Sequence, residues 1–416
     1  MRARPSPARH SRSVGTGGPA YLAPTLLGGH SNDGLDLCPA GQTSKPMLST
    51  ERTQTIPLTV RMTTSVHFAA QFLSPGSGGI ARCARLTMMA LSGKVSIKNA
   101  FAVQDTYPTT IAGVTTRPFR NSRLRFVSAH TTHALRSDVV FYDFPGTARA
   151  HKFLALARKP YAVWVHGLEV WPENLRSDYA AAIRQADAVF ANSHHTFTRV
   201  NESIPGLRNL HVCQLGTERD VETVRSTRST AVREKIALFV GRNDELFDKG
   251  QNAIIDAWPR VLRQVPDAKL YFVGGGVRLD YLRSLAAASP AASSIAVFGY
   301  LPDAEVDRLY DKARLFVMLS RVEGFGLVYA EAMSHGVPIL TSTEDASQYL
   351  NHEGVTGLSV CRDDHDAVAD AIIRILSDDD LHHRLSNGAF EHWASNFSFS
   401  AFAGRFREAA IRAKVI

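Results

Sequence analysis

Two glutamates flank a glycine turn in the segment of the chain that is richest in chemically active residues. Glu323 precedes the sequence Gly-Phe-Gly, and Leu327 begins a predicted helix that carries Glu331. Glycines let a ligand approach the backbone closely, and free amides at the start of a helix suit phosphate or sugar oxygens. Carboxylates accept hydrogen bonds from vicinal hydroxyls, which ribose and sugars both carry. The segment predicts a site for such a ligand, made of Glu323, Gly324, Phe325, Gly326, Leu327 and Glu331.

Two cations follow a predicted strand in the same half of the chain. Arg242 comes directly after the strand, and Lys249 lies seven residues later, before the next predicted helix. Ligands of open α/β sheets bind at the carboxyl ends of the strands. A guanidinium and an ammonium there are the expected counter-charges for a pyrophosphate leaving group, because they stabilise the negative charge that grows as a glycosidic bond breaks.

The first half of the chain offers two weaker signals. The loop SPGSGG, which contains Gly78 and Gly79, follows the first predicted strand and precedes a helix, so its amides could meet the same diphosphate from an opposite wall. His166 ends the strand YAVWVH, just before Gly167, where it could hydrogen-bond a transferred sugar. A buried, satisfied histidine is the competing interpretation.

Apolar strand-like runs alternate with segments of helical period, which is typical of parallel sheets covered on both faces. In the first half, strands are predicted at Val66–Gln71, Leu124–Ser128, Val139–Tyr142, Tyr161–His166 and Ala188–Asn192. In the second half, they are predicted at Ile236–Val240, Lys269–Val273, Ile295–Phe298, Leu315–Leu319 and Pro338–Leu340. Helices are predicted at 80–91, Ser177–Ala186, Asn252–Val265 and Asp303–Ala313. The pattern predicts an α/β protein with two doubly wound domains.

Composition divides the chain further. Residues 1–61 are rich in Ser, Pro, Gly, Thr and Arg and lack a hydrophobic period, so we expect them to be disordered or to be an over-extended start with Met62 as the initiator. The first domain is expected at 62–216 and the second at 233–397. The polar segment 217–232 is the expected linker, and the stretch 398–416 is expected to form an amphipathic helix.

Charge and cysteine usage exclude several classes of protein. The net charge is +8, and half of the excess lies in residues 1–61, which leaves no nucleic-acid signature in the rest. No run approaches the roughly 20 apolar residues of a membrane-spanning helix. The four scattered cysteines indicate neither a disulfide framework nor a zinc site and fit a reducing cytosol. We expect a cytoplasmic protein whose basic balance allows peripheral contact with the inner membrane surface.

The motifs in order resemble those of the retaining glycosyltransferase family four, which has the GT-B fold. They are the Gly78-Gly79 loop, His166-Gly167, ANS at 191–193, FVGR at 239–242, Lys249-Gly250, YFVGGG, FGYLPDAEVDRLYDKA and EGFGLVYAEAMSHGVPI. The resemblance covers about residues 65–390 and is most specific in the second half. It implies two Rossmann-like domains that face each other across a cleft, with the final helix crossing back onto the first domain.

The resemblance also implies roles for individual residues. Arg242 and Lys249 would bind the donor diphosphate, and Glu331 would bind the ribose. Glu323 and the backbone at 325–327 would hold the transferred sugar, the backbone near Gly299 and Tyr300 would lie against the base, and His166 would sit beside the reacting carbon. The anomeric configuration is kept in such enzymes without an obvious protein nucleophile, and the departing phosphate is thought to deprotonate the acceptor hydroxyl.

Such an enzyme needs neither metal nor cofactor, only the nucleotide sugar as co-substrate. The sequence offers no plausible D-x-D metal motif, because Asp378–Asp380 lies between two predicted helices, where capping is the expected role. The acceptor is expected to be a saccharide or a lipid-linked acceptor of bacterial cell-surface synthesis. Its identity stays open, because SDVVFYDFPGTARAHKF replaces the histidine-bearing strand end that is more usual in the family.

Three alternatives to a glycosyltransferase fit the sequence less well. A glycoside hydrolase needs two carboxylates that flank the bond, whereas Glu323 and Glu331 lie along one loop and helix. A dinucleotide oxidoreductase needs G-x-G-x-x-G and a later acid, and the run GGGVRL at 274–279 provides neither in full. A non-catalytic sugar-nucleotide-binding protein on the same scaffold would be expected to have lost one of the charged groups. All four charged residues are present, so an active enzyme is favoured.

Overall fold

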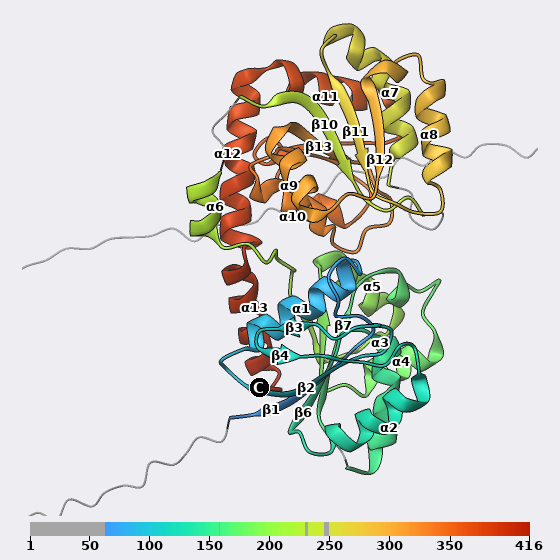
Figure 1. Cartoon of the computed structure of the whole chain (residues 1–416), viewed down its shortest axis with the longest axis vertical. Coiled ribbons are helices and arrows are strands. Elements are labelled where there is room, and N and C mark those ends of the chain that lie inside the picture. Colours follow the sequence, from blue (N-terminus) through green and yellow to red (C-terminus); the bar gives the residue numbers. More distant parts are fainter. Residues whose placement is uncertain (1–62, 158, 229–231, 245–248) are drawn as a thin grey trace, which may run out of the picture. The chain divides into compact units, whose positions relative to one another are not determined.

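The computed structural model of the chain describes residues 63–157, 159–228, 232–244 and 249–416. Two parallel β-sheets form the centres of two α/β layers in this part of the chain (Figure 1). The first sheet has the strand order β5-β2-β1-β6-β7-β8-β9 and the second has the order β12-β11-β10-β13-β14-β15, while β3 and β4 form a separate antiparallel pair. These two doubly wound sheets confirm the predicted α/β class with two Rossmann-like domains.

The strands of the first sheet are β1 (Ser65–Ala70), β2 (Ser96–Ala102), β5 (Arg117–Pro118), β6 (Val139–Tyr142), β7 (Tyr161–Val165), β8 (Ala188–Ala191) and β9 (Leu210–Val212). Those of the second are β10 (Glu234–Val240), β11 (Lys269–Val273), β12 (Ile295–Gly299), β13 (Ala313–Met318), β14 (Ile339–Ser342) and β15 (Gly357–Val360). The short pair is β3 (Thr110–Ile111) and β4 (Val114–Thr115).

The α-helices are α1 (Gly79–Leu91), α2 (Arg123–Ala134), α3 (Pro145–Ala148), α4 (Ser177–Arg184), α5 (His194–Ser203), α6 (Val221–Thr227), α7 (Gln251–Gln264), α8 (Leu279–Ala288), α9 (Asp303–Lys312), α10 (Leu327–Ser334), α11 (His365–Ser377), α12 (Asp379–Asn396) and α13 (Phe399–Arg412). The 3-10 helices are η1 (Arg149–Ala157), η2 (Leu168–Val170), η3 (Ala292–Ser294) and η4 (Ala346–Tyr349).

Both faces of the first sheet are buried, which explains why its strands read as continuous apolar runs. Alternate residues of β6 enter opposite cores, because Val140 and Tyr142 pack on one side of the sheet and Val139 and Phe141 on the other. The terminal helix α13 covers the side of the sheet on which Val139 and Phe141 lie. Its Phe406 ring centroid lies 6.1 Å from that of Phe141, and the same ring also packs on Trp164 and Phe190.

Strand order fixes where each sheet can bind a ligand. In the first sheet the chain runs from β1 to β2 on one side and then to β6 on the other. In the second sheet it runs from β10 to β11 on one side and later to β13 on the other. Ligands of doubly wound sheets bind at the carboxyl ends of the strands where the order reverses. These ends are β1 and β6 in the first sheet, and β10 and β13 in the second.

Most predicted elements are confirmed, but the prediction of a strand at Leu124–Ser128 is wrong. This run lies in α2, because the buried residues Phe126, His130 and Ala134 recur every four positions and form one helical face. The sequence also missed β2, whose first four residues are only partly buried or exposed and therefore lack an apolar run. β2 forms because it pairs with β1. The expected linker 217–232 contains α6, which Asp220 caps through the amide of Thr223.

The predictions for residues 1–61 and for Met62 lie outside the described residues. Within the described part, no helix combines the length and the apolar character needed to cross a membrane.

Candidate active site

The glycine turn before α10 is a tightly packed loop at the carboxyl end of β13. Gly326 has φ of 87°, a left-handed conformation that favours glycine, and it directly precedes the helix. A Cβ on Gly324 would lie 1.8 Å from the carbonyl oxygen of His166. Among the described residues, no hydrogen bond is found from the amides of 325–327. The turn therefore presents backbone donors at a helix N-terminus, where an anion is favoured.

Lys249 and Glu323 form an ion pair beside this turn. Lys249 Nζ lies 2.6 Å from Glu323 Oε2, and their side chains are only 14% and 19% exposed. The lysine is held from the backbone side as well, because the amide of Leu319 donates to its carbonyl oxygen at 3.0 Å. A Cβ on Gly250 would collide with Leu319, which shows how closely this turn packs on the end of β13. The pair places one cation and one carboxylate at the mouth of the turn.

Arg242 stands apart from that ion pair. Its side chain is 75% exposed, and its guanidinium lies 2.8 Å from Asp244 Oδ2. The structure therefore brings Lys249 to Glu323 but does not bring Arg242 into the same contact.

Glu331 is bound by a residue that the sequence analysis missed. Its carboxylate forms an ion pair with Arg82 of α1 and accepts a hydrogen bond from the Tyr310 hydroxyl at 3.3 Å. Arg82 in turn contacts Glu218 at 2.5 Å. The available signal was a cation one turn after the Gly78-Gly79 loop, on the helix that the loop begins.

His166 is buried at the carboxyl end of β7, with 8% of its surface exposed. Its Nε2 lies 2.7 Å from the carbonyl oxygen of Asp143, and because a carbonyl only accepts, Nε2 carries the proton. Burial lowers the pKa of His166, so the ring is neutral and Nδ1 is a hydrogen-bond acceptor. Its backbone carbonyl accepts from Asn192 Nδ2 at 2.8 Å. The ring is thus an oriented acceptor rather than a cation.

Contacts join His166 and its neighbours to the glycine turn. The hydroxyl of Ser193, in the predicted ANS motif, donates to the carbonyl of Gly324 at 2.5 Å. A Cβ on Gly167 would lie 3.4 Å from the Gly324 Cα. The carboxyl ends of strands from both sheets therefore meet at Gly324.

The glycine loop before α1 also faces this region. Gly78 has φ of 88° and precedes α1, and a Cβ on Gly79 would lie 3.8 Å from Leu327 Cδ1. A Cβ on Gly76 would lie 3.9 Å from the hydroxyl of Tyr300, a side chain that is 71% exposed and follows Gly299. The loop, the start of α10 and the end of β12 thus lie together, as expected for the walls of one site.

Asp143 is a second residue that the sequence analysis did not single out. Its Oδ2 accepts from the Gln71 amide at 2.7 Å, and its Oδ1 accepts from the Thr147 hydroxyl at 2.6 Å. Burial raises the pKa of Asp143 to about 7. Asp143 lies directly after β6, and its main-chain oxygen orients His166. The only sequence signal for this residue was that its segment departs from the family pattern.

No cluster of three or more His, Cys, Asp or Glu side chains suited to a metal is found in the described part of the chain. Of the aspartates at 378–380, Asp378 has the predicted capping role. Asp378 accepts from the amide of Leu381 at the start of α12, and Asp379 lies 2.6 Å from Arg314.

Comparison with known proteins gives a consistent picture. Residues 220–392 match the family model described as glycosyl transferases group 1. An uncharacterized glycosyltransferase of Methanocaldococcus jannaschii is 30% identical over 184 residues, which are 44% of this chain and 46% of that protein. The chain thus spans about half the length of this relative. A glycogen synthase of Mycobacterium tuberculosis is 26% identical over 287 residues, covering 69% and 67% of the two chains.

Among solved structures, Anabaena HepE in complex with UDP and glucose superposes with a TM-score of 0.69 at 17% identity. The superposition covers 84% of this chain and all of that one. This likeness supports the fold of two Rossmann-like domains.

Proposed function

We propose that this protein, whose residues 220–392 match the family model of the glycosyl transferases group 1 and whose two sheets form the GT-B fold, transfers a sugar from a nucleotide sugar to an acceptor hydroxyl. The observation that carries the proposal is the ion pair of Lys249 and Glu323 beside the open amides at 325–327. A donor diphosphate needs the cation and the amides, and a sugar needs the carboxylate.

Each part of the donor has a candidate contact. The amides at 325–327 and Lys249 would hold the diphosphate, and the exposed Arg242 would close over it on binding. Glu323 would accept from hydroxyls of the transferred sugar, and Glu331 from those of the ribose. The backbone at Gly299 and the ring of Tyr300, which the glycine loop faces, would border the base.

The proposed reaction keeps the anomeric configuration and uses no metal. Lys249 and the helix N-terminus stabilise charge on the departing diphosphate as the bond to the anomeric carbon breaks. The departing phosphate oxygen takes the proton of the acceptor hydroxyl, which attacks from the same face. His166 accepts from a sugar hydroxyl through Nδ1 and so orients the reacting ring, a role that its neutral state supports.

The acceptor in this proposal is a saccharide or a lipid-linked acceptor of cell-surface synthesis, and the enzyme works in the cytoplasm or at the inner face of the membrane. An acceptor of this kind has free hydroxyls and, when lipid-linked, is presented at a membrane surface. The net charge of +8 is compatible with attraction to anionic lipid.

Calorimetric titration tests the donor site. We expect the full chain to bind one of UDP, GDP or ADP, and Glu331→Ala to weaken this binding at least tenfold because the ribose loses its acceptor. Glu305→Ala, which removes an exposed glutamate of α9, serves as the control and should bind normally. A folded protein that binds none of the three nucleotides would rule out the proposal.

A further inference from the structure

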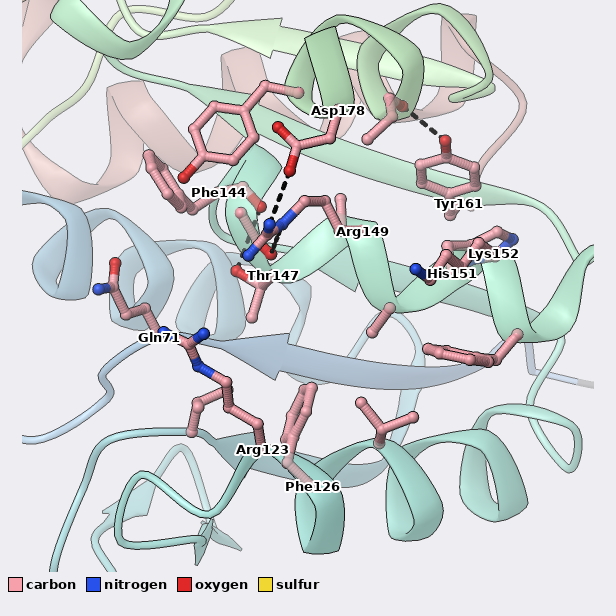
Figure 2. Close-up of a pocket in the computed structure, with 18 of the residues that line it drawn as sticks. Gln71, Arg123, Phe126, Phe144, Thr147, Arg149, His151, Lys152, Tyr161 and Asp178 are labelled. Atoms are coloured by element: carbon pink, nitrogen blue, oxygen red, sulfur yellow. Dashed lines mark hydrogen bonds and ion pairs between the residues drawn. The ribbon is translucent and has the colours of Figure 1, made fainter. Parts of the chain in front are cut away.

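A cavity of about 510 Å³ opens in the first domain, between α2 and the segment formed by α3 and η1 (Figure 2). At one end its wall is formed by Gln71, Gln104 and Phe144. Gln71 directly follows β1, and Gln104 and Phe144 lie two residues beyond the ends of β2 and β6. This is the edge of the sheet where the strand order reverses and where ligands of such sheets bind. The volume suits a sugar-sized ligand.

The cavity is linked to the candidate active site through Asp143. The amide of Gln71, in the cavity wall, donates to its carboxylate at 2.7 Å, and the neighbouring Phe144 lines the cavity. The main-chain oxygen of Asp143 accepts from His166 Nε2 at 2.7 Å. The proposed function requires that His166 lies beside the reacting carbon. The cavity then lies next to that carbon, on the side of the first domain.

The charged residues that line the cavity are mostly cations. They are Arg123, Arg149 and Lys152, against the single carboxylate of Asp178 among the described lining residues. Arg149 is neutralised, because its Nη1 lies 2.7 Å from Asp178. No ion pair is found for Arg123 or Lys152 in the described part of the chain. Two cations therefore face the cavity without a carboxylate.

The remaining walls suit the faces of a ring. Phe144 and Tyr179 pack edge to face with centroids 5.5 Å apart, and Phe126 lines the opposite side from α2. Figure 2 shows Arg123 beside Gln71 at one end of the cavity and Lys152 at the other. A guanidinium at the end nearest Asp143 can bind a phosphate or carboxylate in a bidentate manner.

We propose that this cavity is the acceptor subsite and that it selects acceptors bearing a phosphate ester, which Arg123 binds. The inference rests on the proposed function and adds to it the chemical class of the acceptor. A neutral saccharide leaves Arg123 uncompensated, whereas a phosphorylated one neutralises it. The anionic group can belong to a water-soluble sugar phosphate or to the headgroup of a lipid.

Binding is measured on the full chain with bound nucleotide. The probes are inorganic phosphate, glucose 6-phosphate, glucose, and vesicles of phosphatidylcholine with and without phosphatidylinositol. We expect inorganic phosphate, glucose 6-phosphate or the vesicles with phosphatidylinositol to bind, and neither glucose nor the pure phosphatidylcholine vesicles to bind. Arg123→Gln should weaken the binding at least tenfold, and Arg123→Lys should restore part of it. Arg125→Gln removes an exposed cation of the same helix that lies outside the cavity lining, so it is the matched control and should leave the affinity unchanged.

Comparison of the soluble phosphates with the phosphatidylinositol vesicles identifies the source of the anion. Binding of the soluble phosphates indicates a free sugar phosphate, and binding only to the phosphatidylinositol vesicles indicates a lipid headgroup. The inference is overturned if inorganic phosphate, glucose 6-phosphate and the phosphatidylinositol vesicles all fail to bind while the nucleotide still does, or if Arg123→Gln binds as the native chain does. Loss of nucleotide binding by the native chain overturns the proposed function instead.

Discussion

Glu331 of α10 is ion-paired with Arg82 of α1, a residue 249 positions earlier in the chain. The glutamate assigned to the donor ribose is thereby oriented by the helix that follows the glycine loop, and the guanidinium places positive charge near the expected diphosphate. Arg82 is a positioning residue in this account, since it acts through the carboxylate of Glu331.

Replacing Arg82 should therefore weaken donor binding. For Arg82→Gln we expect the Kd of the bound nucleotide to rise about tenfold, or about 1.4 kcal/mol, because Glu331 loses its orienting partner. Calorimetry measures the change, and Arg125→Gln on α2 is the control for loss of a surface cation. An unchanged Kd would show that Arg82 does not orient Glu331 for the ribose, and a tighter Kd would show that its ion pair competes with the ribose.

Lys249→Ala should chiefly lower turnover. The ammonium stabilises charge on the leaving diphosphate more in the transition state than in the bound donor, so kcat should fall about 100-fold to 1,000-fold with a smaller change in KM. Steady-state kinetics of donor consumption measure both constants. Lys235→Ala, which removes a half-exposed lysine that pairs with Asp267, should have normal kinetics. A change confined to KM would mean that Lys249 contributes only to binding.

Gly324→Ala tests the close approach of the glycine turn to His166. The new Cβ would lie 1.8 Å from the His166 carbonyl oxygen, so the turn or the end of β7 must shift. We expect the free energy of unfolding to fall by about 1–3 kcal/mol and activity to be lost. Gly404→Ala in α13 has nothing within 4 Å of its new Cβ and should raise stability by up to about 1 kcal/mol. Normal activity of Gly324→Ala would refute the contact.

A buried chain of hydrogen bonds makes stability depend on pH. His67 Nε2 lies 3.0 Å from His130 Nδ1, and Tyr142 connects His130 to His151, whose Nε2 lies 2.9 Å from the Lys159 carbonyl. Because that carbonyl only accepts, it fixes the direction of every bond, and His67 Nδ1 is left as a buried acceptor without a partner in the described residues. Burial lowers the pKa of His67 to about 2 and that of His130 to about 3.

These lowered pKa values fix the sign of the effect. The histidines of the unfolded chain take up protons near pH 6.5, whereas those of the folded chain do not. The free energy of unfolding is therefore undiminished by these histidines above pH 6.5 and falls as the pH decreases toward 3. His67→Leu removes one such proton. The stability of the native chain relative to this variant should fall by about 1.4 kcal/mol per pH unit below pH 6 in denaturant titrations. The exposed His365→Leu is the control, and a constant difference for His67→Leu would contradict the account.

Strand ends were the part of the site that sequence predicted best. His166 and Arg242 were placed at the carboxyl ends of apolar runs, and β7 and β10 end just before them. The contact of Arg82 with Glu331 could not be predicted, because it joins two helices through tertiary folding alone. The acceptor-side cavity was missed for a local reason: its wall includes α2, whose residues Leu124–Ser128 have the β-branched and apolar composition of a strand.

The most direct test of the central claim follows the anomeric proton by NMR while the chain consumes the nucleotide sugar whose nucleotide it binds, with EDTA present. We expect the first product to carry the same anomeric configuration as the donor, EDTA to leave the rate unchanged, and Glu323→Gln to abolish the signal. An inverted product, a rate that requires an added divalent metal, or binding without any turnover would contradict the claim.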